Sequence, residues 1–375
     1  MCSYMAMFPA SLPHSVIRWL TKPGEVVYDP FSGRGTTPLE ARLLGRVGLA
    51  SDLNPLALVL SGAKSDPPSK HELAQRLAHL ARNRHREDPR QVPEFVRMLF
   101  SDETLGELLW LRSTLSPGRR ADRFLLGTLL GILHANADAQ GHPRGLTIAM
   151  PNTFSMAPGY VSRFIRRHRL KPPRVSPLQM LEQRATALWR QLPSRGCVWH
   201  RDARAADTGP ISRTPAKLLL TSPPYLHVIK YGKLNWVRLW LLGHDPKDVD
   251  GALFSSSSVT RYLSFMADVI RANAELIRDD GYMVLVIGDV RRPDGDLDLA
   301  RAVAEQAVAG SGLRVMSVLV DRLPTKHKVS RIWGDTKGKA TKTDRLLILG
   351  GRRAPRLPIF PEIEWTKEVP RGVRG

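Results

Sequence analysis

Residues 25–52, EVVYDPFSGRGTTPLEARLLGRVGLASD, contain the most regular pattern in the chain. The apolar segment 25–31 predicts a strand that ends in a loop. Residues 32–46 predict a glycine-rich turn that opens a helix, and residues 47–52 predict a second strand. This strand–turn–helix–strand order is typical of a βαβ unit, so the sequence predicts a parallel sheet.

Further strand-like segments appear towards the end of the chain, and helical stretches separate several of them, notably residues 261–280. This alternation predicts an α/β fold with about seven strands. The five later segments are residues 197–203, 217–222, 282–290, 314–320 and 345–351.

Residues 56–195 differ in character from the sequence on either side of them. Several segments there carry helical periodicity, and loops rich in proline and glycine separate them. The sequence therefore predicts a helical insertion between the two parts of the sheet. The helical segments are residues 71–87, 102–115, 122–139 and 177–192.

The chain of 375 residues carries 56 Lys and Arg against 35 Asp and Glu, a formal net charge of +21. Such a charge favours polyanionic partners, nucleic acid first, although a basic surface without a partner is the alternative. The two cysteines predict neither a disulfide framework nor a zinc cluster, and no metal site is expected. No apolar run approaches the ~20 residues of a membrane span and the N-terminus lacks a secretory pattern, so we expect a soluble cytoplasmic protein.

The turn after the first strand places Asp29 at the strand end, with Gly33 and Gly35 before the helix. Glycines there let the backbone turn sharply and let a ligand approach closely. Asp52 ends the second strand, where a carboxylate can bind a ribose diol, although a structural turn and a helix cap also explain these residues. The lysine of nucleoside triphosphate loops and the third glycine of the dinucleotide pattern are missing. The carboxylate of Asp29 instead suits a cationic amine, as in the amino acid end of S-adenosylmethionine.

A second loop follows a strand-like segment and reads TSPPY at residues 221–225. Pro223 and Pro224 stop the strand, so the segment is either a turn or a site. Ser222 and the Pro223 carbonyl are hydrogen-bond acceptors that the prolines hold rigidly, and Tyr225 places an aromatic ring beside them.

DPFSGRGTT (29–37) followed by TSPPY resembles the S-adenosylmethionine-dependent amino-methyltransferases that modify exocyclic amines of DNA bases. Their motifs run D-P-F-x-G-x-G-T and [DNS]-P-P-[YFW]. Methyl transfer to a base amine, the activity that the resemblance implies, needs acceptors that draw the conjugated nitrogen towards tetrahedral geometry. Ser222 and the Pro223 carbonyl can supply them, and Tyr225 can stack on a base that has left the duplex. The resemblance implies a Rossmann-like methyltransferase fold with a mostly parallel seven-stranded sheet, and S-adenosylmethionine as the cofactor. It also implies that Asp52 binds the ribose and that Asp202, in WHRDAR (199–204), lies near the adenine. The cofactor-binding residues that it implies are Phe8, Pro9, Asp29, Phe31, Gly33, Gly35, Thr36, Asp52 and Asp202, and the catalytic residues are Ser222, Pro223, Pro224 and Tyr225.

Serine in the S-P-P-Y position is most typical of those family members that make N4-methylcytosine, whereas adenine-N6 enzymes more often carry Asp or Asn. The resemblance therefore favours a site-specific DNA methyltransferase acting on cytosine N4. Adenine N6 in DNA and a base amine in RNA stay open, and a non-catalytic basic nucleic-acid-binding protein is the alternative from another class. The expected partners are DNA and, as a candidate, a cognate restriction endonuclease. We expect a monomer or homodimer associated with the nucleoid.

The motifs, which cover most of residues 5–60 and 197–350, and the helical insertion, which the resemblance does not match, predict four regions in the chain. Residues 1–60 and 196–355 form the two parts of a catalytic domain, residues 61–195 form an insertion that recognises the target, and residues 356–375 form a tail. Basic and aromatic residues interleave at 156–174, which suits phosphate contacts with base stacking, although a solvated helix face is the alternative. A basic segment at 322–344 predicts a mobile loop. The predicted nucleic-acid-binding residues are Arg163, Arg166, Arg167, Arg169, Lys171, Lys328 and Arg331.

Overall fold

The computed structural model describes residues 9–134, 144–149, 157–226, 230–290, 296–321 and 340–359. Three predicted site residues, Phe8, Lys328 and Arg331, lie outside these ranges. The chain forms two compact units, each of which is described by itself. The sheet unit comprises Tyr4–Ser61, Leu192–Ile229 and Leu253–Gly375, and the helical unit comprises Met1–Ser3, Gly62–Gln191 and Lys230–Ala252.

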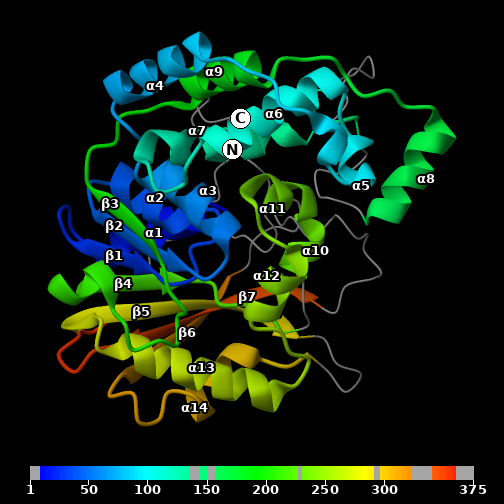
Figure 1. Ribbon diagram of the computed structural model, residues 1–375. Helices are drawn as coiled ribbons and strands as arrows, with labels where there is room; N and C mark the ends of the chain where they lie inside the picture. Colours follow the sequence, from blue (N-terminus) through cyan, green and yellow to red (C-terminus); the bar gives the residue numbers. More distant parts are fainter. Residues whose placement is uncertain are drawn as a thin grey trace. The chain divides into compact units, whose positions relative to one another are not determined.

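The sheet unit is built on a seven-stranded sheet with the order β3-β2-β1-β4-β5-β7-β6 (Figure 1). The first five strands in this order pair in parallel, and β7 runs antiparallel to both β5 and β6. The predicted α/β class is therefore confirmed, as a Rossmann-like, mostly parallel sheet. The strands are β1 (Val26–Asp29), β2 (Val47–Asp52), β3 (Gly196–His200), β4 (Ala216–Thr221), β5 (Ile277–Val290), β6 (Arg314–Asp321) and β7 (Ala340–Gly350).

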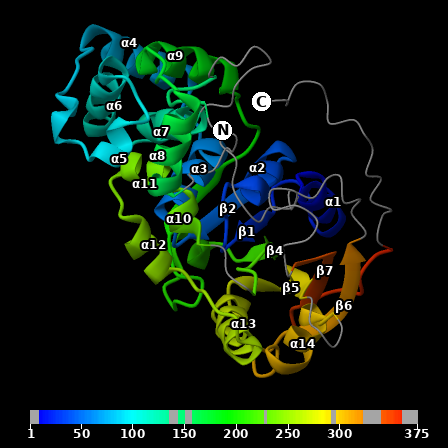
Figure 2. The same ribbon diagram turned by 90° about the vertical axis from the view of Figure 1, so that its right-hand side faces the viewer.

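Helices cover both faces of the sheet, which explains the continuous apolar runs within its central strands, residues 26–28, 218–220 and 282–287. Side chains alternate along a strand, so Val27 packs with one helix layer and Tyr28 with the other. The layer on the Val27 face includes α1 (Ser11–Leu20) and α2 (Thr36–Leu43), and the layer on the Tyr28 face includes α13 (Val259–Ala274) and α14 (Leu299–Gln306). Figure 2 shows α13 and α14 together along one side of the sheet.

The order of the strands places a switch point between β1 and β4. From β1 the chain continues to β2 on one side, and β4 lies on the other side of β1. In open α/β sheets the crevice at the carboxyl ends of the strands that flank such a point is the usual ligand site. Both sequence motifs, which follow β1 and β4, therefore start at the carboxyl ends of the two strands that flank this point.

The helical unit has the helices that the periodicity predicts, and serine caps mark where several begin. Ser69 and Glu72 form a capping box at the start of α4, and Ser101 and Ser176 accept backbone N–H groups at the starts of α6 and α9. Leu108 of α6 is buried and belongs to the apolar interior of the helical unit. The helices are α4 (Lys70–Arg82), α5 (Glu94–Arg97), α6 (Asp102–Thr114), α7 (Arg120–Leu133), α8 (Pro158–His168), α9 (Pro177–Leu188), α10 (Tyr231–Leu234), α11 (Trp236–Leu242) and α12 (Pro246–Ala252), and α3 (Pro55–Ser65) runs from the sheet unit into this one.

Two predicted boundaries are wrong. The helix predicted over 261–280 ends at Ala274, and β5 begins at Ile277, which is buried and pairs with Ala216 of β4. Ile270, Asn273 and Ile277 are spaced as on one helix face, so the helical period continues past the end of the helix. The strand β7 begins at Ala340, so the end of the loop predicted at 322–344 is a strand, and residues 322–339 lie outside the described ranges.

Among the residues that the structure describes, no helix is both long and apolar enough to cross a membrane.

Candidate functional site

The two motif loops are joined by a hydrogen bond at the switch point. Asp29 is the last residue of β1, Thr221 is the last residue of β4, and the two strands are neighbours in the sheet. Thr221 Oγ1 donates to Asp29 Oδ1 over 2.5 Å. The glycine-rich loop and the TSPPY loop therefore leave the sheet side by side, although 192 positions separate these two residues in the sequence.

Asp29 is nearly inaccessible, with 2% of its surface exposed. The backbone N–H of Phe31 also donates to its Oδ1, over 3.1 Å. Burial raises the pKa of Asp29 to about 7, although the hydrogen bonds from Thr221 and Phe31 act in the opposite direction. This carboxyl group is therefore part of the internal framework that joins the loops, and it changes charge near neutral pH.

Asp52, at the end of β2, holds the glycine-rich loop in place. Its Oδ2 accepts the N–H of Gly33 over 2.8 Å, and its Oδ1 accepts the N–H of Asn54 over 2.9 Å. Burial raises the pKa of Asp52 to about 6, with these N–H groups acting in the opposite direction, so the side chain is mostly a carboxylate at neutral pH. Gly33 and Gly35 have φ angles of 50° and 78°, a region in which residues with a Cβ are strained.

The loop residues fit a polar ligand such as the ribose of S-adenosylmethionine. A carboxylate offers about four lone-pair positions, so Asp52 keeps acceptor capacity after its two N–H contacts. Ser32 Oγ, in the same loop, is buried and has no hydrogen-bond partner among the described residues. An unpaired buried hydroxyl costs about 1–3 kcal/mol, a cost that a ligand contact at the loop would reduce.

The TSPPY loop orients the hydroxyl of Ser222. Ser222 Oγ donates to the backbone carbonyl of Val286 on β5 over 3.3 Å. A carbonyl oxygen only accepts, so the hydroxyl proton points at Val286, and the lone pairs of Oγ stay available to accept a proton from another group. Pro223 is buried and Pro224 is half-buried, which holds the loop against the sheet.

The ring of Tyr225 lies against Gly288 of β5. A Cβ at Gly288 would stand 2.9 Å from Tyr225 Cε1 and 3.2 Å from Asp344 Oδ1. Gly288 therefore leaves the space that the ring occupies. Nothing in the sequence singles out Gly288, beyond its place at the end of an apolar strand.

Asp202 lies in the turn after β3, where Arg204 holds both of its carboxylate oxygens. Arg204 Nε donates to Oδ1 over 3.0 Å and Nη2 donates to Oδ2 over 2.6 Å. These hydrogen bonds lower the pKa of Asp202 below its usual value. The role of Asp202 near the adenine of the cofactor stays a prediction. A ligand bound there would share the carboxylate with Arg204.

The turn after β3 depends on a buried arginine that the sequence did not single out. Arg201, 3% exposed, donates to Tyr28 Oη over 3.2 Å and to Asn273 Oδ1 over 3.0 Å. It also donates to the carbonyls of Ala205 and Asp207. Arg201 thus fixes the turn that carries Asp202. The only signal for it in the sequence is its place in WHRDAR.

The remaining predicted cofactor residues occupy different surroundings. Pro9 accepts the N–H of Leu12 at the start of α1, and Thr36 is the first residue of α2. The ring of Phe31 lies 6.1 Å from that of Phe265, on the apolar side of the sheet that α13 covers. The structure thus joins Asp29 to the catalytic loop and Gly33 to Asp52, whereas Phe31 packs with the core.

The predicted nucleic-acid-binding residues that the structure describes belong to the helical unit. Arg163, Arg166 and Arg167 are exposed on α8, and Arg169 and Lys171 are exposed just after it. Both motif loops belong to the sheet unit.

Comparison with known proteins gives one match to a family. Residues 3–57, which carry the glycine-rich loop and Asp52, match the N6_N4_Mtase model, described as DNA methylase. No curated protein matches the chain.

Solved structures give weak likenesses. TrmN from Thermus thermophilus has a TM-score of 0.35 and 13% identity, over 92% of this chain and 50% of TrmN. The rRNA methyltransferase AviRa from Streptomyces viridochromogenes has a TM-score of 0.32 and 11% identity, over 92% of this chain and 86% of that one. Geranyl diphosphate C-methyltransferase from Streptomyces coelicolor A3(2) has a TM-score of 0.34 and 8% identity, over 91% of this chain and 80% of that one. Likenesses at these scores carry no argument, so the family match is the finding that bears on function.

Proposed function

We propose that this chain is an S-adenosylmethionine-dependent methyltransferase that methylates the exocyclic N4 amine of cytosine in DNA. The hydrogen bond between Thr221 and Asp29 carries the proposal, because it brings the glycine-rich loop and the TSPPY loop together at the switch point of the sheet. The match of residues 3–57 to a DNA methylase model supports the same activity.

The glycine-rich loop binds the cofactor. Asp52 accepts the ribose hydroxyls with the lone pairs that Gly33 and Asn54 leave free. The backbone of Gly33 gives the cofactor close access, since Gly33 has no side chain. Gly35 lets the loop pack closely on α3, because a Cβ there would stand 2.7 Å from the Cα of Ser61. When bound, S-adenosylmethionine supplies a methyl group on a positively charged sulfur.

The TSPPY loop holds the target amine. Ser222 Oγ accepts one amino hydrogen, because its own proton is directed to Val286, and the carbonyl of Pro223 accepts the other. Both acceptors are fixed before the base arrives, since the prolines restrict the backbone. The ring of Tyr225, held beside Gly288, stacks on the base that has left the duplex. Ser222 and Pro223 thereby draw the nitrogen lone pair out of conjugation with the base.

Serine at position 222, rather than Asp or Asn, is what favours cytosine N4 over adenine N6. The helical unit selects the sequence that is methylated, and a cognate restriction endonuclease that cuts the same sequence is the proposed partner. Swapping residues 90–190 changes the methylated sequence; an unchanged site preference would contradict that role.

The test is transfer of a radioactive methyl group from S-adenosylmethionine to unmodified plasmid DNA and to RNA, followed by digestion and mass spectrometry of the nucleosides. The expected product is N4-methylcytosine in DNA. S222A and Y225A each lower the rate by about tenfold or more, as expected when a positioned group at the reacting atom is lost. S212A, which removes an exposed hydroxyl after β3, serves as the matched control. Undiminished methyl transfer by both S222A and Y225A would rule out the proposed site. Detection of N6-methyladenine in place of N4-methylcytosine would show that the target base is adenine.

A further inference from the structure

Residues 157–174 form a strongly basic segment that consists of α8 and the stretch after it. The segment holds six Arg or Lys and no Asp or Glu. All six basic side chains are exposed, and only Val161 of α8 is buried. A helix that contributes so little to the core, yet carries this charge, is not explained by packing. The six residues are Arg163, Arg166, Arg167, Arg169, Lys171 and Arg174.

A row of rings runs along α8 between these charges. Tyr160, Phe164 and His168 are spaced four residues apart and therefore lie on one face of the helix. The rings of Tyr160 and Phe164 are 6.1 Å apart with an interplanar angle of 20°, and those of Phe164 and His168 are 4.4 Å apart. Tyr160 is 39% exposed, so the first ring of the row is open to solvent.

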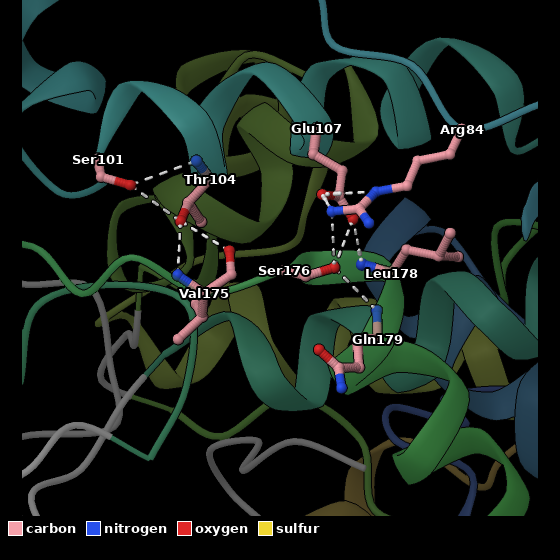
Figure 3. A network of polar contacts seen from close by, with 8 residues as sticks. All are labelled: Arg84, Ser101, Thr104, Glu107, Val175, Ser176, Leu178 and Gln179. Carbon is pink, nitrogen blue, oxygen red and sulfur yellow. Dashed lines mark hydrogen bonds and ion pairs between the residues drawn. The ribbon is translucent and has the colours of Figure 1, made fainter.

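Two buried polar groups of α6 hold the chain just after the basic segment (Figure 3). Thr104 Oγ1 accepts the N–H of Val175 over 3.1 Å and donates to the carbonyl of the same residue over 2.8 Å. Glu107, which is buried, accepts the N–H of Leu178 over 2.7 Å and the hydroxyl of Ser176 over 2.9 Å. The chain is therefore held in place directly after the basic segment, at residues 175–178.

Arg169 ends α8 with a φ of 48°, and it is the one non-glycine residue with a positive φ in the described parts of the chain. Glycine is the usual residue at this position of a helix end, because a Cβ there costs about 1 kcal/mol. A strained, exposed arginine at a site suited to glycine points to a use for its charge.

We propose that the basic segment binds a nucleic-acid strand with unpaired bases, with phosphates on the arginine row and a base on the exposed ring of Tyr160. Interleaved aromatic and basic side chains are the combination that binds single strands, because rings stack on bases and cations contact phosphates. The surface extends the proposed function by naming a second binding site for the nucleic acid, outside the TSPPY loop. Its test does not depend on methyl transfer.

The first measurement separates a local site from the general effect of the net charge of +21. The affinity of the full chain for a fluorescent 20-nucleotide single strand is measured from 50 to 300 mM salt. A triple variant, R163Q/R166Q/R167Q, is compared with K70Q/R82Q/R119Q, which removes the same charge from exposed positions elsewhere in the helical unit. We expect the slope of log K against log salt to fall by about 2 for the first variant, from three lost phosphate contacts at about 0.7 each, and by much less for the second. Equal losses in the two variants would overturn the proposal in favour of a solvated basic face.

The second measurement tests the stacking role of the Tyr160 ring and the role of the strained residue Arg169. Y160A is expected to weaken single-strand binding about fivefold or more and to leave binding of the matching duplex almost unchanged, since stacking needs an unpaired base. Equal weakening of both would remove the stacking role. R169G is expected to keep or raise thermal stability and to weaken binding, whereas unchanged binding would remove Arg169 from the site.

S222A separates this proposal from the proposed function. It lies in the TSPPY loop, so it is expected to lose methyl transfer and to keep wild-type oligonucleotide binding at the basic segment. If the α8 triple variant binds normally while S222A abolishes transfer, the basic segment is excluded and the methyltransferase site stands. If the triple variant loses binding while S222A transfers the methyl group normally, the basic segment stands and the methyltransferase site is excluded.

Discussion

The motif loops of the sheet unit and the basic segment of the helical unit use charge in opposite ways. Asp29 and Asp52 are buried, and hydrogen bonds from Thr221, Gly33 and neighbouring N–H groups fix their orientation. The arginines of α8 are exposed, and Arg166, for example, hydrogen bonds locally, to Ser162 on the preceding turn. Chemistry at one reacting atom needs groups that are placed in advance, whereas a phosphate backbone can be held by mobile cations. Substitutions should therefore have large and specific effects in the loops and small, salt-dependent effects on α8.

The largest effect is expected at Gly35. Its φ is 78°, and a Cβ there would stand 2.7 Å from the backbone Cα of Ser61. G35A therefore has to displace the glycine-rich loop or α3, and we expect loss of S-adenosylmethionine binding by about 100-fold or more together with a clear loss of thermal stability. Calorimetric titration and thermal unfolding measure both.

Gly24 supplies the control for this change. Its φ of 84° is similar, but a Cβ there has nothing within 4 Å. G24A should therefore show the backbone strain alone, about 1 kcal/mol, with normal cofactor binding. Equal behaviour of G35A and G24A would mean that the close packing of the loop on α3 is unimportant.

A smaller and more selective effect is expected at Gly288. G288A places a methyl group 2.9 Å from the ring of Tyr225, so the ring has to move away from its present position. We expect kcat to fall about tenfold while the affinity for S-adenosylmethionine stays within about twofold, because only the base-stacking group is displaced. G251A, in α12 with open space around its Cβ, is the matched glycine control. A fall in cofactor affinity as large as the fall in kcat would contradict the assignment of Tyr225 to the target base.

The next effect concerns pH. The pKa of Asp29 is raised to about 7 in the folded protein from an ordinary value of 3.8, so the native state holds this proton more tightly than the unfolded chain does. Its contribution to stability is complete below about pH 4 and is lost as the pH rises through about 7. D29N removes this titration, so the variant should lose about 2 kcal/mol less stability than the wild type between pH 5 and pH 8. Urea unfolding at several pH values measures the difference, and parallel curves for the two proteins would contradict the burial of an ionisable group at this position.

The smallest effect is expected from a single charge on α8. R166Q should weaken binding of a single strand about two- to threefold at low salt and have no measurable effect near 300 mM, because one phosphate contact is lost and salt screens the rest. A loss that persists at high salt would mean that Arg166 makes a specific contact instead.

The sequence predicts a segment of each of the seven strands because each strand contains a short run rich in apolar residues, and it predicts both motif loops because glycine and proline mark them. The end of α13 was missed because Ile277 continues the helical spacing while pairing in a strand. The link between Asp29 and Thr221 could not be read from the sequence, since it depends on the order of strands far apart in the chain. The roles of Gly288 and Arg201 were missed for the same reason, because each acts through a contact with another part of the sheet unit.

The proposed division of labour between the two loops can be tested most directly by measuring cofactor affinity and methyl transfer in the same three proteins: wild type, D52A and S222A. Asp52 lies at the cofactor loop and Ser222 at the loop for the target amine. D52A should lose both S-adenosylmethionine binding and transfer, whereas S222A should bind the cofactor with wild-type affinity and lose transfer alone. Wild-type cofactor affinity in D52A, or wild-type transfer in S222A, would contradict the site.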